Sequence, residues 1–241
     1  MTEYAQDRLR TAHDPTFARF LDLFHHRMLS LFYRAWANNR PTVSFDRGAD
    51  DRFAGYVASL FGLGMPSLRG RDALPDRAKL HYAGLLACQT CHPDGLRAMV
   101  RAYFGLPAAI REFVGEWLAL PREGRCRLGA SRDTGTLGES VVIGAYIWSG
   151  RHKFRLMIGP VGLNPFRRFL PAGSSLPRLA AMVRSYVGDE LAWELNPILA
   201  ADEVPPLRLG EHTQLGWTSW LTTGGLPRAG DDLVFSAPGA G

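Results

Sequence analysis

Hydrophobic side chains recur every three or four residues from Phe17 to Trp36, with polar residues between them. The positions of this stripe are Phe17, Phe20, Leu21, Phe24, Met28, Leu31, Phe32 and Trp36. Such spacing places the side chains along one face of an α-helix. Asp14 and Pro15 supply a cap and a first-turn proline, and Asn38 and Pro41 supply a stop. The pattern predicts one long amphipathic helix.

Helical periods continue up to Phe104. The further predicted helices are Asp51–Leu63, Asp76–Leu86 and Pro93–Phe104. The tripeptide Gly105-Leu106-Pro107 then interrupts the pattern, because glycine and proline both disfavour a continuing helix. We therefore expect a helical region over residues 1–105.

The pattern changes after residue 105, where glycine, proline, β-branched and aromatic residues become frequent. Strands are predicted at Ala109–Leu118, Leu191–Leu199 and Leu215–Leu221. A hairpin is also predicted, in which Val141–Trp148 pairs with Lys153–Ile158 across residues 149–152. These strands indicate a β-rich domain over residues 106–241.

One helix is expected within this second half. Pro177 lies in the first turn of the segment Leu176–Val187, and Gly188 follows in the C-terminal cap position. Residues Gly159–Gly173 are predicted to form a long loop, of the kind that often carries a contact surface. The predicted fold class is therefore α+β, with a helical region followed by a mixed, mainly antiparallel β-rich domain that includes one or two helices.

Most tryptophans of the chain lie in the predicted strands, where such large side chains usually belong to the core. They are Trp117, Trp148, Trp193, Trp217 and Trp220. Trp217 and Trp220 are three positions apart and would lie on opposite faces of a strand. Either one of these two rings is exposed for a partner, or the backbone bulges there.

Composition indicates a folded protein that binds other proteins. The chain has 241 residues, of which 46% are hydrophobic and 21% charged, which is ordinary globular usage. The 28 basic and 23 acidic side chains are spread along the chain with no block of lysine and arginine, which argues against nucleic acid. Arginine carries most of the positive charge and suits ordered protein contacts.

The expected location is the cytoplasm. The first residues are polar and lack the apolar core of a secretory signal, and no uninterrupted apolar run of about 18 residues could insert into a membrane. The chain has three cysteines, and an odd number cannot all pair in disulfide bonds. This favours a reducing compartment.

The sharpest short motif is Cys88-Gln89-Thr90-Cys91-His92, which matches the C-x-x-C-H pattern that attaches a c-type haem. Haem attachment would require export, for which no signal is predicted. A zinc site would need a further ligand from His81, Cys126 or His152, and the adjacent Cys91 and His92 do not easily bind one ion. We expect half-buried cysteines at a helix junction and no cofactor or metal. The alternative function is that of a small redox or haem-binding protein.

No motif of a metalloprotease, an α/β-hydrolase nucleophile or a phosphate-binding loop occurs in the sequence, so we expect no enzyme. Several longer segments, in order along the chain, instead resemble the TssG family of type VI secretion. They are FLDLFHHRMLSLFYRAW from Phe20, GLRAMVRAYFGLP from Gly95, FVGEWLALP from Phe113, LGESVVIGAYIW from Leu137, KFRLMIGPVGLNPFRRFLPAG from Lys153 and LGWTSWL from Leu215. The family usually has a further stretch before the first segment, so we expect a shortened start here.

The resemblance implies a non-catalytic wedge component of the secretion baseplate, which is docked at the cytoplasmic side of the inner membrane. It implies a hetero-oligomeric assembly with TssF and TssE and a link to TssK, with the VgrG spike as a further partner. No nucleic acid and no direct membrane insertion are expected. The motif at Cys88–His92 has no counterpart in this resemblance and is interpreted as incidental.

Two surfaces are candidates for partner contacts. The exposed side of the first long helix, with His25, His26 and Arg27, is expected to bind helices of TssF. The predicted loop Gly159–Gly173 combines aromatic and guanidinium groups of the kind enriched at interface hot spots. Its residues are Phe166, Arg167, Arg168 and Phe169. Alternatively, the two phenylalanines fix the loop to its own sheet.

Overall fold

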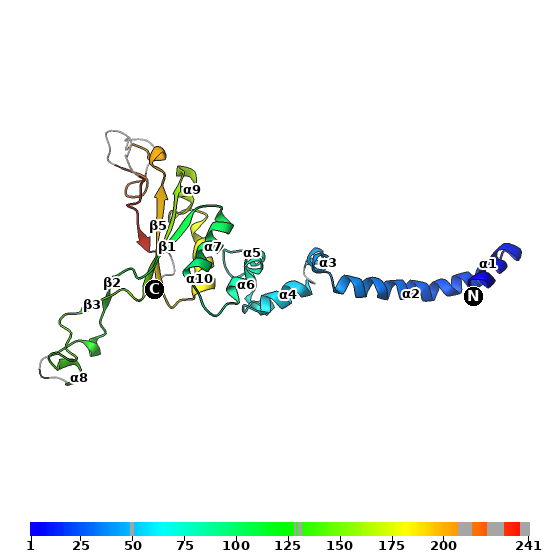
Figure 1. Ribbon diagram of the computed structural model, residues 1–241, viewed down its shortest axis with the longest axis horizontal. Coiled ribbons are helices and arrows are strands. Elements are labelled where there is room, and N and C mark those ends of the chain that lie inside the picture. The colour runs from blue at the N-terminus through cyan, green and yellow to red at the C-terminus, as the bar shows by residue number, and fades with distance from the viewer. Residues whose placement is uncertain (49–50, 128, 130–131, 207–213, 221–228, 237–241) are drawn as a thin grey trace. The chain divides into compact units, whose positions relative to one another are not determined.

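Figure 1 shows a computed structural model of the chain, which describes residues 1–48, 51–127, 129, 132–206, 214–220 and 229–236. The chain divides into two compact units, Met1–Leu68 and Arg69–Gly241. Helices change to strands after Phe104, close to the expected boundary at residue 105, but the second unit begins earlier. The reason is that helices between residues 69 and 105 share a hydrophobic core with the sheet.

The first unit is helical. Its helices are α1 (Thr2–Thr11), α2 (Thr16–Asn38), α3 (Pro41–Asp46), α4 (Arg52–Ser59) and the 3-10 turn η2 (Pro66–Leu68). The helix α2 confirms the long helix predicted from residue 17 to residue 36. The backbone N–H of Thr16 donates to the Asp14 carboxylate at 3.0 Å, so Asp14 does stabilise the start of α2. The helix α1 was not predicted, because its polar residues show no apolar stripe.

The second unit contains the sheets and the remaining helices. Its helices are α5 (Asp76–His81), α6 (Ala83–Leu86), α7 (Pro93–Phe104), α8 (Arg132–Gly135), α9 (Leu163–Arg168) and α10 (Leu176–Val187), with 3-10 turns η3 (Arg122–Gly124) and η4 (Ala201–Glu203). Its strands are β1 (Ala108–Arg111), β2 (Glu116–Ala119), β3 (Tyr146–Ser149), β4 (Lys153–Val161), β5 (Ala192–Leu199) and β6 (Phe235–Ser236). The fold is α+β, as predicted.

The main sheet has four strands in the order β1-β4-β5-β6. β4 and β5 are parallel, and the other neighbours in this sheet are antiparallel. The helices α9 and α10 connect β4 to β5, and α7 and α10 pack beside each other near β1 (Figure 1). Phe154 on β4 and Trp193 on β5 stack with ring centroids 6.5 Å apart and contribute to the shared core.

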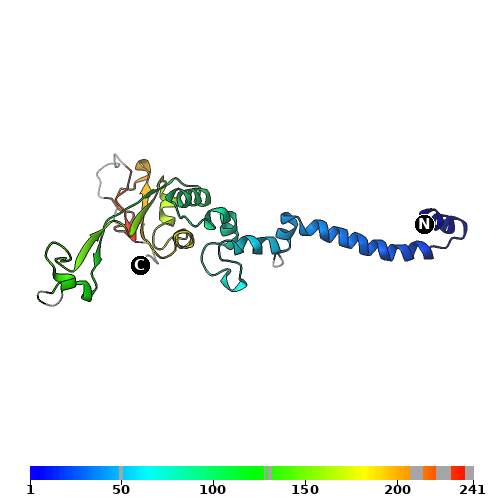
Figure 2. The same cartoon turned by 60° about the horizontal axis from the view of Figure 1, so that its bottom comes forward.

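The predicted hairpin between residues 141–148 and 153–158 is wrong. β3 pairs with β2, and the two strands form a separate antiparallel ribbon, which Figure 2 shows beside the main sheet. The predicted single strand Ala109–Leu118 is also wrong, because β1 and β2 belong to different sheets. Phe113 adopts a left-handed φ of 56° between them and ends the extended run. The rings of Trp117 and Trp148 meet at 5.3 Å, and this cross-strand pair favours the β2–β3 register.

Two other predictions need correction. The segment Gly159–Gly173 is no long loop, because it continues β4 to Val161 and then forms α9. The predicted strand at Leu215–Leu221 is a turn over residues 215–217, in which the Trp217 N–H donates to the Gln214 carbonyl at 3.0 Å. Trp220 makes an isolated bridge with Pro206, and Leu221 lies outside the described residues.

The start of α7 is fixed to the end of α10 by a short hydrogen-bond network. The Nδ1 atom of His92 accepts from the backbone N–H of Gly95 at 2.9 Å and caps α7. The Tyr186 hydroxyl donates to the His92 carbonyl at 3.1 Å, and the Cys91 thiol donates to the Tyr186 carbonyl at 2.9 Å. Burial raises the pKa of the Tyr186 phenol, and the nearby thiols Cys91 and Cys88 add to this rise.

An ionic cluster joins β4, β5 and the base of the ribbon. The Lys153 Nζ lies 2.9 Å from the Glu194 carboxylate and 3.5 Å from that of Glu116. Arg155, on the same strand as Lys153, also pairs with Glu194. Burial by itself raises the pKa of Glu194, but the bonds from Lys153 and Arg155 outweigh it and lower the pKa overall. The cluster therefore holds two strands of the sheet and one strand of the ribbon.

The first testable prediction concerns Gly95, where an added Cβ would lie 2.2 Å from the Tyr186 hydroxyl oxygen. Gly95→Ala must displace that buried ring and weaken the network at His92. We expect the free energy of unfolding to fall by about 1–3 kcal/mol, measured by urea denaturation. Gly84→Ala is the matched control, because a Cβ there has no atom within 4 Å and helix propensity favours alanine. Equal stability changes in both variants would contradict the prediction.

The second prediction concerns Glu194→Gln, which removes the negative charge between Lys153 and Arg155. We expect the free energy of unfolding at neutral pH to fall by about 1–3 kcal/mol. Because folding lowers the pKa of Glu194, its contribution is present above its ordinary value of 4.5 and is lost as the pH falls through the lower folded value. Denaturation curves in this acidic range should therefore be less pH-dependent in the variant than in the natural sequence.

The matched control for this experiment is Asp189→Asn. Asp189 lies 2.7 Å from Arg184, but both side chains are exposed, so the pair should contribute little. A loss of stability as large as that of Glu194→Gln would show that the cluster has no special importance.

Candidate partner interfaces

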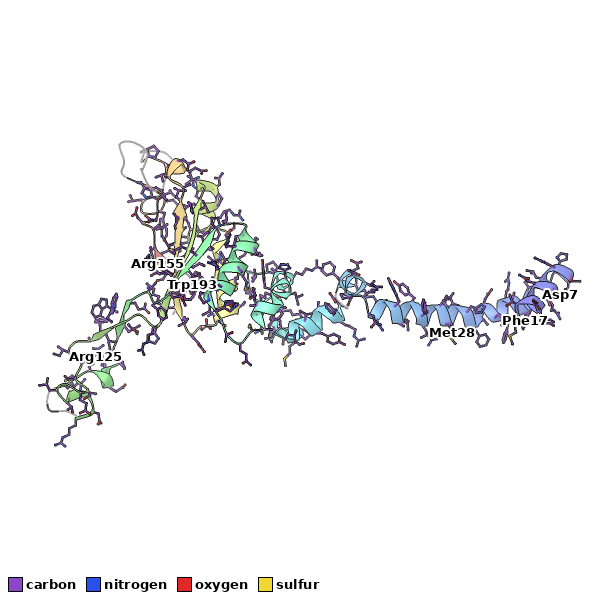
Figure 3. The ribbon with its side chains drawn as sticks, in the orientation of Figure 1. Asp7, Phe17, Met28, Arg125, Arg155 and Trp193 are labelled. Carbon is purple, nitrogen blue, oxygen red and sulfur yellow. The ribbon has the colours of Figure 1, made fainter. Side chains whose placement is uncertain are left out.

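The apolar side chains of α2 are largely uncovered within the first unit. Figure 3 labels Phe17 and Met28 along this helix, and the Met28 side chain is 62% exposed. The large exposed residues of α2 are Phe20, Leu23, Phe24, Met28, Leu29, Leu31, Phe32, Tyr33 and Trp36. Among the residues of α2, Ala37 is the buried one. An apolar surface of this extent is typical of a binding site for another protein.

Apolar residues also lie outside the predicted stripe. Successive residues of an α-helix point about 100° apart. Leu23, Leu29 and Tyr33 therefore lie away from the face that carries Phe24 and Met28. A helix that is apolar on most of its circumference is normally surrounded by other elements.

The predicted contact residues His25, His26 and Arg27 are exposed, but they do not share one face. By the same angular spacing, His25 and Arg27 flank the apolar stripe on its two sides. His26 points away from the stripe. No contact of these residues with a partner is part of the structure, so their role stays a prediction.

The β2–β3 ribbon carries a second exposed aromatic surface. Trp117 is 66% exposed and Trp148 is 58% exposed, so the prediction that both belong to the core is wrong. The two strands form a sheet separate from the main one, where the two rings lie against each other and Trp148 also lies against Gly115. Tyr146 and Ile147 on β3 are exposed as well.

The predicted contact residues on α9 divide into buried and exposed groups. Phe166 and Phe169 are fully buried in the core, where Phe169 meets Phe104 and Phe166 meets Trp220. The expectation that these two phenylalanines form an outer contact surface is therefore wrong, and the alternative that they fix this segment to its own sheet holds. Arg167 and Arg168 are exposed.

The remaining tryptophans pack against the core. Trp193 is buried, as predicted. Trp217 and Trp220 are half-buried, and Trp217 contacts Phe235 at 5.2 Å between ring centroids. Because this segment turns instead of forming a strand, both rings can lie on the same core, which leaves neither fully exposed for a partner.

The packing of the fold explains the residues of the Cys88–His92 motif. Cys88 and Cys91 are free thiols at the surface, and Cys91 and His92 hold α7 to α10 through the hydrogen bonds described above. In the part of the chain that the structure describes, no group of three histidine, cysteine or acidic side chains is arranged to hold a metal ion. Likewise, no helix within the described residues is long and apolar enough to cross a membrane.

A pocket of about 360 Å³ lies beside this motif, between the start of α7, the end of β1 and the end of α10. His92 and Lys153 both line it. His92 caps α7, and Lys153 is held by Glu194 and Glu116, so both already have structural partners. This arrangement does not resemble a set of groups that converge on a substrate.

Comparison with known proteins gives a consistent result. A family model described as "Type VI secretion, TssG" matches residues 1–222. Among curated proteins, none matches the chain. A chain in the cryo-electron microscopy structure of the type VI secretion system TssK-TssF-TssG baseplate subcomplex is similar, with a TM-score of 0.72 and 22% identity over 90% of both chains.

A second similar chain comes from a structure of the baseplate complex of the type VI secretion system. Its TM-score is 0.65 at 23% identity, and the match covers 92% of this chain and 64% of that chain. At these identities the solved structures establish a shared fold. Since the family model spans residues 1–222 of 241, the chain belongs to the TssG family of type VI secretion.

Proposed function

We propose that this chain is a structural subunit of a type VI secretion baseplate and that it assembles with TssF and TssK. The family match supports the system, and the similar chains come from structures of the baseplate and of a TssK-TssF-TssG subcomplex. The single observation that carries the proposal is the exposed apolar surface of α2, because an isolated protein gains nothing from leaving such a surface in water.

The helix α2 is the proposed site for TssF. Its apolar residues are distributed around the helix, which suits insertion between several helices of a partner better than a lateral contact on one side. His25 and Arg27 flank the stripe and would form the polar rim of such an interface. The aromatic surface of the β2–β3 ribbon, with Trp117 and Trp148, is a second proposed contact surface.

The remaining parts of the proposal rest on the family resemblance. They are contacts with TssE and with the VgrG spike, a place at the cytoplasmic side of the inner membrane, and the lack of any catalytic role. A contact of Arg167 and Arg168 with TssK is proposed from the exposure of these two side chains on α9. The redox or haem-binding alternative has no support from the family match, and Cys91 and His92 already have a structural role at the junction of α7 and α10.

The third testable prediction concerns Phe24→Glu and Phe32→Glu, which place a carboxylate on the apolar stripe of α2. Both phenylalanines are exposed, so the fold of the chain should persist. Burial of the new charge against an apolar partner is costly, and we expect the amount of TssF that co-purifies with the tagged chain to fall by about tenfold or more. TssF and the tagged chain would be expressed together and quantified after affinity purification.

The matched control is Arg19→Glu, which introduces the same side chain at an exposed position of α2 that is already charged and carries no apolar contact surface. We expect it to retain TssF. Circular dichroism of each variant would verify that α2 is still helical. If both phenylalanine variants retain TssF as the natural sequence does, the proposed role of α2 is wrong.

A further inference from the structure

A small pocket lies where the segment after α9 meets the first turn of α10. Its volume is about 200 Å³, and it lies next to the end of α7. The residues that line it include Tyr103, Phe104, Arg168, Phe169, Ser175 and Arg178. The family match assigns no role to this pocket, and the proposed assembly gives its residues only the contact of the exposed Arg168 with TssK.

The connection between α9 and α10 is held in one conformation around the pocket. The Ser175 N–H donates to the Arg168 carbonyl at 3.0 Å, and the Gly173 N–H donates to the Leu170 carbonyl at 2.7 Å. A Cβ at residue 173 would lie 2.1 Å from the Arg168 carbonyl oxygen, so only glycine permits this close turn. Ser175 is thereby placed at the N-terminal cap of α10.

Ser175 is an unusual cap residue. Its residue exposure is 1%, yet its side chain makes no capping hydrogen bond to α10. Among the described residues the Ser175 hydroxyl has no hydrogen-bond partner, and Ser175 lines the pocket. The hydroxyl is not among the fully buried side-chain atoms that lack a partner, so it is accessible from the pocket and is free to donate to a molecule bound there.

The first turn of α10 adds further donors. The helix has 12 residues, and its first hydrogen bond of helical type joins the Leu179 N–H to the Ser175 carbonyl at 2.9 Å. The backbone N–H groups of Leu176 and Arg178 therefore have no acceptor within the helix. Such a helix end carries partial positive charge and favours an anion.

Two arginines complete the positive character of the pocket. Arg168 and Arg178 both line the pocket. Neither guanidinium group forms an ion pair with a described carboxylate. The described residues that line it include no aspartate or glutamate. Guanidinium groups bind phosphate through paired hydrogen bonds.

We propose that this pocket binds a phosphate group. The Ser175 hydroxyl and the free amides of α10 would donate to its oxygens from one side, and Arg168 and Arg178 would neutralise its charge. A tetrahedral oxyanion has enough acceptor atoms for all of these donors, whereas chloride does not form directed pairs with them. The rings of Tyr103 and Phe104 form an apolar wall, which would contact the organic part of a phosphate ester.

The test is a titration of the full chain at constant ionic strength, with affinity measured by calorimetry. Inorganic phosphate and phenyl phosphate serve as probes, with sodium chloride as the reference. We expect saturable binding of both phosphates and none of chloride. Tighter binding of phenyl phosphate would identify a phosphate ester as the ligand, and equal binding would identify free phosphate.

The variants Arg168→Gln and Arg178→Gln should each weaken phosphate binding by about tenfold, which corresponds to one charge-assisted hydrogen bond. Ser175→Ala should weaken it by a few-fold. The matched control is Arg167→Gln, since Arg167 is an exposed neighbour that does not line the pocket, and it should bind as the natural sequence does.

The proposal is wrong if phosphate does not saturate below about 10 mM. It is also wrong if Arg167→Gln weakens binding as much as Arg168→Gln, because the effect would then reflect net charge alone. Circular dichroism of the variants would verify that they fold. Since the readout is the affinity of the chain for phosphate, a negative result leaves the proposed assembly with TssF and TssK untouched.

Discussion

The parallel pairing of β4 with β5 determines how the rest of the second unit packs. β5 is buried on both faces, with Trp193 and Leu195 on one side and Glu194 and Asn196 on the other. Parallel neighbours require a long crossover, and α9 and α10 form it and cover the apolar side of the sheet. On the opposite side, Glu194 must be paired because it is buried, which explains the cluster with Lys153 and Arg155. The pairing of β4 with β5 thus accounts for the crossover helices, the core and the cluster of charged side chains in this unit.

Local signals made some elements predictable and left others hidden. The ends of α7 and α10 agree with the predicted ends, because caps and prolines such as Pro93 and Gly188 act over a few residues. Strand pairing is not local, and nothing near Val141 or Lys153 indicates that β3 pairs with β2 across an intervening 26 residues, from Leu120 to Ala145. The resemblance to TssG was predictable because it uses many ordered segments and needs no knowledge of their pairing.

The candidate contact residues were predicted from residue type, and type alone does not give burial. Phe166 and Trp117 are both large aromatic residues, but α10 and the sheet enclose the first, while the ribbon leaves the second exposed. The sequence assigned Trp117 to the core and left Phe166 open between a contact surface and the core. By contrast, the apolar stripe of α2 was found correctly, since its period is a property of the helix itself. That the stripe remains uncovered within its unit required the structure.

The two units differ in what can stabilise them. The second has a continuous core, whereas the first buries little beyond Ala37 and Ala58 and leaves the long side chains of α2 in water. Full burial of one such side chain is worth about 1.5–3 kcal/mol, so covering several of them would exceed a typical cost of association. The apolar surface that the first unit does not bury in a core of its own can therefore stabilise an interface when a partner covers it. Under the proposed function, assembly with a partner would therefore add to the stability of this unit, because a partner that binds only the folded helix favours the folded state.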